Sequence, residues 1–392
     1  MLKEKIQQLA EVYLEESIQI RRHLHANPEL SYQEFETAAF VESQLQALGL
    51  KTQRMADTGV VALIEGKNPS SRTVALRADM DALPIQELND VVYRSKKEGI
   101  MHACGHDAHT ACLLGAARIL KELSQEWSGT VKLIFQPGEE KNPGGASYMI
   151  RDGVLKNPIP EAIFALHVHP GLPTGQVSFR SGKVMASADE LYFTIKGKGG
   201  HAAAPHLAID PILIASHLVV GLQQIISRNK NPHQPSVLSI TSFQAGTTTN
   251  VIPHEVKMMG TFRAMDEAWR AEGHRLIEKY TKELTESMGG SAELHIDKGY
   301  PCVYNDETLH TQAVQLAETF LGKQHVEETE LRMGAEDFGY YSQEIPGCFF
   351  RLGVMNQEKG ITNGVHTPNF DIDEAAIKTG IGLLAWMGAN AT

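Results

Sequence analysis

The stretch ELYFTIKG, residues 190–197, decides how the chain divides. Leu191, Phe193 and Ile195 alternate with polar residues, which is typical of a β-strand with one buried face. The elements expected after it complete a β-α-β-β-α-β order, which indicates a ferredoxin-like unit. They are a helix at 211–228, strands at 236–246 and 255–264, a helix at 268–288 and a strand at 292–299.

On both sides of this unit, strands alternate with helices, which predicts an α/β fold with a mostly parallel sheet. The 392 residues are enough for two domains. We therefore expect a catalytic α/β domain made of residues 1–186 and 299–392. A ferredoxin-like α+β lid or dimerisation domain, residues 187–298, would be inserted into it. The strands expected outside the insertion are 59–66, 73–78, 130–136, 162–168 and 347–354, and the main helices are 108–123 and 373–388.

Residues 29–49 predict a further helix with recognisable end signals. Ser31 and Glu34 have the spacing of a capping box, in which the two side chains bind the free backbone N–H groups of a first helical turn. Gly49 is the expected stop of this helix.

The composition excludes several classes of protein. Charged residues make up 21% of the chain and hydrophobic residues 42%, as in soluble globular proteins. The net charge of −11 argues against a nucleic-acid or anionic-membrane surface. No apolar run reaches the length of a membrane span, and residues 1–20 read as a charged amphipathic helix rather than a signal peptide. Four cysteines do not make a disulfide framework. We therefore expect a cytoplasmic protein without nucleic-acid or membrane partners.

Side chains that can bind metals gather where the predicted strands end, the edge at which open α/β sheets bind ligands. The stretch GIMHACGHDAHT, residues 99–110, opens the helix after the second of these strands, and GVHTPNF, residues 364–370, forms a loop near the end of the chain. Thiolate, imidazole and carboxylate donors together suit zinc, with manganese, cobalt or nickel as alternatives. Five donors exceed one tetrahedral zinc, so one or two ions per subunit are expected. The candidate ligands are Cys104, His106, Glu140, His167 and His366.

Other interpretations of these residues stay open at this point. Cys104 could be a buried thiol or a nucleophile beside a histidine, as in a cysteine hydrolase. A nucleophile would leave Glu139 and His366 unexplained. His102 and His109 could support the ligands or be purely structural. A metal-stabilised binding protein without turnover would need the metal but not Glu139, and the intact pair of glutamates in the FQPGEE stretch argues against it.

Nine short motifs follow one another along the chain: LRADMDALP, HACGHDAHT, FQPGEE, HVHP, GKGGHAAAPH, TTTNVIP, GTFRA, MGAEDF and VHTPNF. This ordered set resembles the metal-dependent peptidases of the aminoacylase and carboxypeptidase G type. Within them it is similar to the amidohydrolase branch, which includes hippurate hydrolases, N-acetyl-diaminopimelate deacetylases and indole-3-acetyl-amino-acid hydrolases. The resemblance covers essentially the whole chain, and the ordered set is far more specific than any one motif.

The resemblance implies a role for each candidate residue. The five candidate ligands match the metal ligands of the branch, and Glu139 matches the general base. Asp81 would orient a metal-binding histidine or support the charge of the metal. His201 resembles a histidine that reaches an active site from the inserted domain, sometimes across a dimer. Asn250 and Arg263 resemble residues that hold the carboxylate of the substrate.

The implied activity is hydrolysis of the amide bond of N-acyl amino acids, which releases a carboxylic acid and a free amino acid. A dipeptidase or carboxypeptidase on the same scaffold is the alternative, and a homodimer through the inserted domain is implied. The chain departs from many members of the wider family, which have a metal-binding histidine where Asp79 stands. His167 is chosen over His169 as a ligand because the branch uses the histidine directly before the valine.

Overall fold

A computed structural model describes residues 1–391, which form two compact units. The first contains Met1–Val184, Tyr304–Leu331 and the chain from Asp337 onward. The second contains Met185–Val303 and the short segment Arg332–Glu336. We call them the catalytic unit and the inserted unit, and each is described by itself.

The catalytic unit is built on an eight-stranded sheet with the strand order β1-β2-β4-β3-β5-β16-β6-β15. The four central strands, β4, β3, β5 and β16, run parallel to one another. All seven residues of β3 and of β4 are buried, as expected for parallel strands in the middle of a sheet. The strands are β1 (Thr52–Met55), β2 (Gly59–Glu65), β3 (Thr73–Asp79), β4 (Thr130–Gln136), β5 (Ala162–Pro173), β6 (Val177–Phe179), β15 (Val326–Glu328) and β16 (Gly347–Met355).

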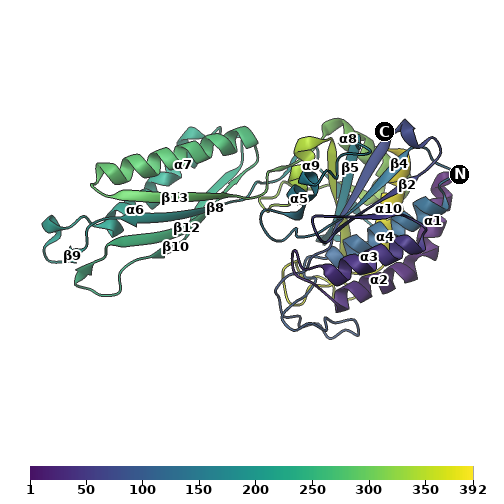
Figure 1. The fold of residues 1–392 in the computed structure, drawn as a ribbon, viewed down its shortest axis with the longest axis horizontal. Coiled ribbons are helices and arrows are strands. Elements are labelled where there is room, and N and C mark those ends of the chain that lie inside the picture. The colour runs from purple at the N-terminus through teal and green to yellow at the C-terminus, as the bar shows by residue number, and fades with distance from the viewer. Residues whose placement is uncertain (392) are drawn as a thin grey trace. The chain divides into compact units, whose positions relative to one another are not determined.

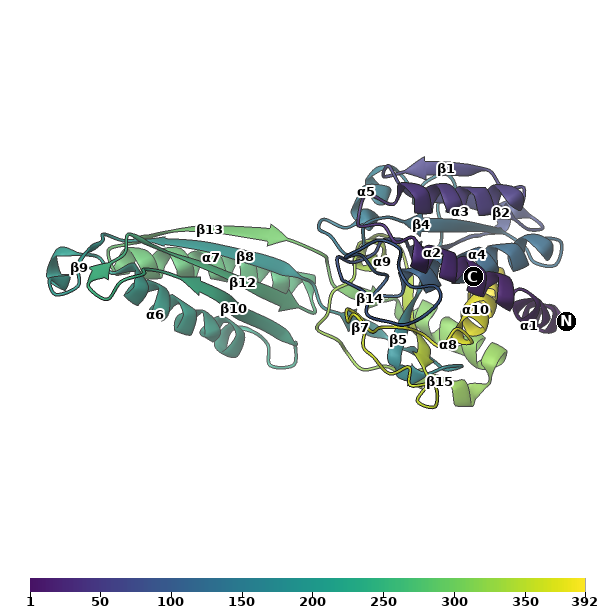
Figure 2. The same cartoon turned by 90° about the horizontal axis from the view of Figure 1, so that it is seen from below.

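Helices cover this sheet from both sides (Figures 1 and 2). Helices α4 and α10 pack on each other and on the central strands, and α1, α2, α3 and α8 surround them. Helices α5 and α9 pack on the opposite face, against β4, β5 and β16. Their bounds are α1 (Leu2–Val12), α2 (Leu14–Ala26), α3 (Phe35–Ala47), α4 (His106–Glu122), α5 (Gly145–Arg151), α8 (Glu307–Leu321), α9 (Phe338–Glu344) and α10 (Ala376–Asn390).

The inserted unit is a four-stranded antiparallel sheet with the order β10-β12-β8-β13, and α6 and α7 pack on it (Figure 1). Leu191, Phe193 and Ile195 of β8 are buried in its core, as their alternation predicts. The chain order β-α-β-β-α-β confirms the ferredoxin-like prediction, and the α/β class of the catalytic unit is confirmed as well. The elements are β8 (Asp189–Lys196), α6 (Pro211–Gln224), β10 (Ser236–Gln244), β12 (Glu255–Ala264), α7 (Glu267–Ser287), β13 (Ser291–Lys298) and a separate two-stranded sheet of β9 (Gly200–His201) and β11 (Val251–Ile252).

Two further short strands, β7 (Gly182–Met185) and β14 (Val303–Asn305), lie where the chain passes from one unit to the other. In the part of the chain that the structure describes, no helix has both the length and the apolar character needed to cross a bilayer.

The predicted capping box at the start of α3 is wrong. The helix begins at Phe35, and the side chain of Glu34 makes no capping hydrogen bond. The hydroxyl of Ser31 donates to Asp81, which lies fifty residues further along the chain. The spacing of Ser31 and Glu34 fits a helix cap, but both side chains make hydrogen bonds with residues far along the chain instead. Gly49, the predicted stop, follows the last turn of α3 with φ +73°, a conformation that favours glycine.

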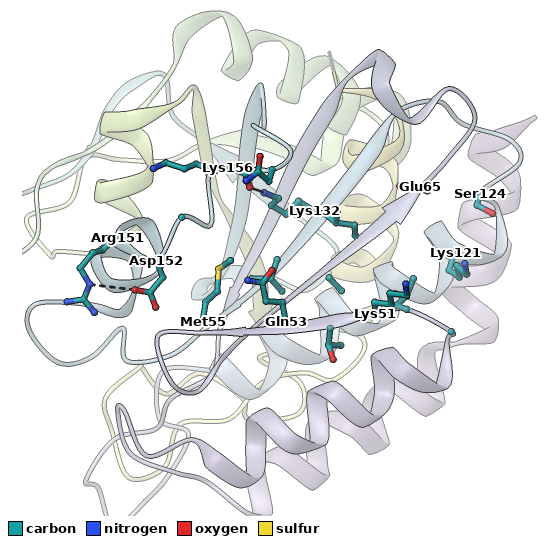
Figure 3. Close-up of a pocket in the computed structure, with 18 of the residues that line it drawn as sticks. Lys51, Gln53, Met55, Glu65, Lys121, Ser124, Lys132, Arg151, Asp152 and Lys156 are labelled. Carbon is teal, nitrogen blue, oxygen red and sulfur yellow. Dashed lines mark hydrogen bonds and ion pairs between the residues drawn. The ribbon is translucent and has the colours of Figure 1, made fainter.

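A cavity of about 870 Å³ lies on the α5 side of the sheet, against β1, β2 and β4 (Figure 3). Lys132 of β4 lines it, and its buried ammonium donates to the carbonyl oxygens of Val154, Lys156 and Pro158 at 2.7–2.8 Å. Burial lowers the pKa of Lys132 to about 8. All three N–H donors are used by the loop after α5, so this lysine holds the loop rather than a ligand.

Lys132→Met should lower the free energy of unfolding by about 2–4 kcal/mol, because buried carbonyl oxygens would lose their donors. Urea unfolding measures the change. Lys156→Met is the matched control, since this side chain is exposed in the same cavity and its carbonyl is retained. Equal stability of the two variants would contradict the role given to Lys132.

Candidate metal centre

The predicted ligands come from four separate segments of the catalytic unit. Cys104 immediately precedes α4, and His106 is the first residue of that helix. Glu140 follows β4, and His167 lies in β5. His366 belongs to the loop before α10 and has a left-handed backbone, with φ +61°. The three strand-end segments meet because parallel strands end at the same edge of the sheet.

The structure brings these five side chains together. The Cys104 sulfur lies 3.4 Å from Nε2 of His167 and 3.3 Å from Nε2 of His366. An oxygen of Glu140 lies 3.1 Å from His366 Nε2 and 4.0 Å from His106 Nε2. One thiol, three imidazoles and a carboxylate therefore converge on one small space, as a divalent cation requires.

The ring nitrogens of two of these histidines are oriented for metal binding. His106 Nδ1 lies 2.9 Å from the carbonyl oxygen of Asp81, and His167 Nδ1 lies 2.8 Å from that of Val168. A carbonyl only accepts, so each Nδ1 carries a hydrogen, and in the neutral ring each Nε2 presents a lone pair. Nε2 of His106 is buried and has no hydrogen-bond partner among residues 1–391. An unpaired buried ring nitrogen beside a thiol and a carboxylate fits a bound cation.

The charges at this site also fit a cation. Burial, with the charges of Glu140 and Glu139, raises the pKa of the Cys104 thiol well above its usual value. Burial disfavours the charged form of His106, but Asp79 and Asp81 outweigh it and raise the pKa of His106 to about 10, so a bound cation would replace the proton on Nε2. Burial lowers the pKa of His167, which keeps this imidazole neutral. The cluster is thus rich in negative charge, and a divalent ion would stabilise the thiolate.

The carboxylate of Asp81 ties three segments of the site together. Its oxygens accept the backbone N–H groups of Glu139 at 3.0 Å and of Glu140 at 2.9 Å. They also lie 3.2 Å from His106 Nδ1 and 2.6 Å from the Ser31 hydroxyl. Asp81 is fully buried, and these partners outweigh the effect of burial and lower its pKa. The side chains of Glu139 and Glu140 lie near one another, with a Glu139 oxygen 4.0 Å from His106 Nε2.

His109 and Asp79 have a supporting position. Nε2 of His109 accepts the N–H of Val168 at 2.9 Å, so Nδ1 carries the hydrogen and donates to Asp79 at 2.6 Å. Both nitrogens are used, which leaves no lone pair for a metal. Asp79 also pairs with Arg77 at 2.6 Å. The hydrogen-bonded Asp79–His109 pair therefore holds the backbone of β5 directly after His167.

Two further histidines are distinct from the cluster. His169, two residues after His167, is only partly buried, and its Nδ1 accepts from the N–H of Gly171. His102 is buried, and burial lowers its pKa to about 4. Neither belongs to a group of converging metal-binding atoms in the described chain.

Three predicted residues lie in the inserted unit. Asn250 directly precedes Val251, which pairs with His201 in the two-stranded β9–β11 sheet, so His201 and Asn250 lie side by side. His201 Nδ1 accepts the N–H of Ala203 at 3.0 Å, so a neutral ring has its hydrogen on the exposed Nε2. Arg263 lies at the other end of β12, and its Nε donates to the Thr261 hydroxyl at 3.1 Å. The structure thus joins two of these three residues and separates the third from them.

The sequence patterns gave no functional role to Glu34. It is fully buried, and burial, with the nearby charge of Asp81, raises its pKa to about 7. Its carboxylate accepts the N–H of Gly138, in the loop that carries Glu139 and Glu140. The pattern that could have revealed it, Ser31 with Glu34, is also the pattern of a helix cap.

Residues 75–387 match the sequence profile of peptidase family M20/M25/M40. An N-acyl-L-amino acid amidohydrolase from Geobacillus stearothermophilus is 45% identical over 78% of this chain and 82% of its own. Thermostable carboxypeptidase 2 from Saccharolobus solfataricus is 39% identical over 93% of this chain and 92% of its own. The crystal structure of a dinuclear metal-binding peptidase of the M20 family from Bacillus subtilis superposes with a TM-score of 0.84. It is 35% identical and covers 97% of this chain and 98% of its own.

Cys104→Ser should reduce the divalent metal bound per subunit, because a hydroxyl is a much weaker ligand than a thiolate. Elemental analysis after gel filtration measures the bound metal. Cys112→Ser is the matched control, since Cys112 is a buried thiol of α4 that lies outside the cluster. Equal metal content in the two variants would remove Cys104 from the ligand set.

Proposed function

The chain belongs to peptidase family M20/M25/M40 and is an amide hydrolase, and on that premise we propose that it hydrolyses N-acyl amino acids. The products are a carboxylic acid and a free amino acid. The observation that carries the proposal is the convergence of Cys104, His167, His366 and Glu140, with Glu139 beside them. The similarity to an N-acyl-L-amino acid amidohydrolase supports this substrate class.

A carboxypeptidase or dipeptidase activity is the second candidate, and the carboxypeptidase among the relatives favours it. Both activities cleave an amide next to a carboxylate, so the metal centre alone does not separate them. The two activities can be separated by comparing kcat/KM on acetyl- and benzoyl-amino acids with kcat/KM on unblocked dipeptides and peptides. Higher kcat/KM for the acylated amino acids is the result expected from the first proposal.

We propose Cys104, His106, Glu140, His167 and His366 as ligands of one or two divalent ions per subunit. Zinc fits the mixed sulfur, nitrogen and oxygen donors best, and manganese, cobalt or nickel are the alternatives. A bound ion of this kind lowers the pKa of a water toward neutrality and polarises the carbonyl group of the substrate. The buried Nε2 of His106, which has no hydrogen-bond partner among residues 1–391, supports its place in the set.

Glu139 is the proposed general base. Its backbone N–H is held by Asp81, and its carboxylate lies at the edge of the ligand cluster. From there it takes a proton from the attacking water and later gives it to the leaving nitrogen. A carboxylate bound to a metal can do neither, which is why the adjacent Glu140 is given the ligand role. Asp81 contributes by fixing both glutamates and the ring of His106.

For substrate binding we propose His201, Asn250 and Arg263. The exposed Nε2–H of a neutral His201 can donate to the developing oxyanion, an interaction typically worth about 3 kcal/mol. Asn250, beside it, can donate to the same substrate. Arg263 suits a carboxylate because its planar guanidinium binds both oxygens.

We also propose a homodimer formed through the inserted unit. Arg263 lies eight residues along β12 from Glu255, the end of the strand next to the two-stranded β9–β11 sheet that carries His201. At a rise of ~3.3 Å per residue the two ends are too far apart for one small substrate to contact both. If all three residues serve one substrate, His201 and Asn250 must come from one copy and Arg263 from another.

The surface of the inserted unit supports such pairing. Leu213 and Val220 are 52% and 75% exposed and lie two helical turns apart on α6. Strand β10 forms one edge of the sheet, and α6 packs beside it. An apolar helix face next to an unpaired strand edge is a surface that a second copy can cover. A cytoplasmic location is also proposed, and it agrees with the four free, buried cysteines.

Glu139→Gln should keep its bound metal and lose about 10²–10⁴-fold in kcat on an N-acyl amino acid, because Gln cannot carry the proton. Steady-state kinetics and elemental analysis give the two quantities. Glu358→Gln, which changes an exposed loop carboxylate, is the control. Glu336→Gln would not serve, because Glu336 is buried. Normal turnover by the metal-loaded Glu139→Gln enzyme would disprove the base assignment.

His201→Ala should also be inactive with its metal retained. Mixing it with Glu139→Gln and letting the subunits exchange should restore about a quarter of wild-type activity. Half of the dimers are then mixed, and each mixed dimer has one site with both residues. The recovery is measured by comparing the activity of the mixed sample after exchange with the activities of the two unmixed variants. If activity does not recover although subunit exchange is demonstrated, His201 acts in the active site of its own subunit and not in that of its partner.

A further inference from the structure

Three successive backbone N–H groups in the loop after β4 are all held by buried carboxylates. The N–H of Gly138 donates to Glu34 at 2.8 Å. The N–H groups of Glu139 and Glu140 donate to Asp81 at 3.0 Å and 2.9 Å. The loop therefore uses its backbone donors for anchoring and leaves the carboxylates of both glutamates for chemistry.

The turn that precedes α3 contacts this loop directly through Tyr32 and Glu34, and indirectly through Ser31. Ser31 donates to the same Asp81 carboxylate that binds the loop. Glu34 accepts from Gly138 and, with the same oxygen, from the N–H of Tyr32, while its other oxygen accepts from the Thr58 hydroxyl at 2.7 Å.

The hydroxyl of Tyr32 reaches the far end of the loop. It donates to the carbonyl oxygen of Lys141 at 2.6 Å and accepts the N–H of Gly144 at 3.1 Å. Residues 138–144 are therefore held at both ends by residues 31–34, in addition to the hold of Asp81 on the middle of the loop.

The fit between the turn and the loop leaves no free space. Tyr32 is a non-glycine residue with φ +66°, a conformation that costs about 1 kcal/mol or more and persists only when its surroundings fix it. Gly138 also has a left-handed backbone, with φ +59°. A Cβ at Gly138 would lie 2.3 Å from the Tyr32 ring. The two residues fix each other, which makes the position of the following Glu139 well defined.

We propose that the Ser31–Glu34 turn is a positioning device for the general base, and that Glu34 and Tyr32 act through the backbone of Gly138–Gly144 on Glu139. The inference rests on the proposed role of Glu139 and adds residues from outside the segment that matches the family profile. Without the turn, the loop would keep Asp81 as an anchor, so the metal ligands stay in place while the proton-transfer geometry loosens. Small displacements of a catalytic group are costly in rate because proton transfer needs hydrogen-bond contact.

Glu34→Ala tests the device directly. We expect kcat to fall about 10- to 100-fold, with KM within about 2-fold and bound metal unchanged. Thr58→Val is the matched control, because it breaks the bond to the other oxygen of Glu34 and leaves the bond to Gly138. Glu34→Gln should rescue most of the turnover, since its amide oxygen can still accept the two N–H groups. Equal losses in Thr58→Val and Glu34→Ala, or no loss in either, would overturn the proposal.

A double variant separates positioning from general stability. If Glu34 acts through Glu139, adding Glu34→Ala to Glu139→Gln should not lower the residual turnover further. A further fall of the same size would show a merely structural role and overturn the proposal. Normal turnover by Glu139→Gln alone would instead disprove the proposed role of Glu139 as the general base, on which this inference rests. An inactive Glu139→Gln with a fully active Glu34→Ala would overturn only the positioning role.

Tyr32→Phe keeps the test valid if Glu34→Ala does not fold. It removes only the hydroxyl that binds Lys141 and Gly144, and it retains the ring that packs on Gly138. We expect about a 5-fold lower kcat with unchanged bound metal, a smaller loss than for Glu34→Ala because Gly138 stays anchored. Wild-type kcat in the folded, metal-loaded Tyr32→Phe enzyme would overturn the proposal.

Discussion

The carboxylate of Asp81 is the constraint on which the site depends. It is buried, has no guanidinium or ammonium partner among residues 1–391, and is stabilised by hydrogen bonds from three segments of the chain. Those segments are the turn before α3, the start of α4 and the loop after β4. A buried carboxylate is costly unless its oxygens are paired, so the three segments are held at fixed positions around it. The imidazole of His106 and the two adjacent glutamates acquire their orientation from that arrangement.

The same principle extends outward from Asp81. Asp79 fixes the ring of His109, which in turn holds the backbone beside His167. Glu34 fixes Gly138. In each case a buried acid binds a donor that lies next to a side chain proposed as a ligand or as the base. Such outer contacts set the direction of ligand lone pairs and the basicity of the ligands. They also explain how the chain can fold with so much negative charge at one edge of the sheet, because nearly every carboxylate there accepts a hydrogen bond.

Much of this arrangement follows from the sequence. The α/β class, the inserted ferredoxin-like unit and the family were predictable because strand periodicity and ordered motifs report them directly. The gathering of donors at one edge was predictable because parallel strands end together. Local patterns were insufficient where tertiary contacts decide. Ser31 and Glu34 match a helix cap, but their partners lie far along the chain. His106 and His109 are one helical turn apart on α4, and only the contacts of their ring nitrogens distinguish a candidate ligand from a support.

The most direct measurement of the central claim is removal and return of the metal. The purified protein would be treated with a chelator, dialysed and assayed on N-acyl amino acids before and after addition of zinc, manganese, cobalt or nickel. The account predicts that turnover disappears with the metal and returns with at least one of these ions, in proportion to the ions bound per subunit. Full activity in the metal-free protein, with loss of activity only after alkylation of its thiols, would contradict the account and favour a cysteine nucleophile.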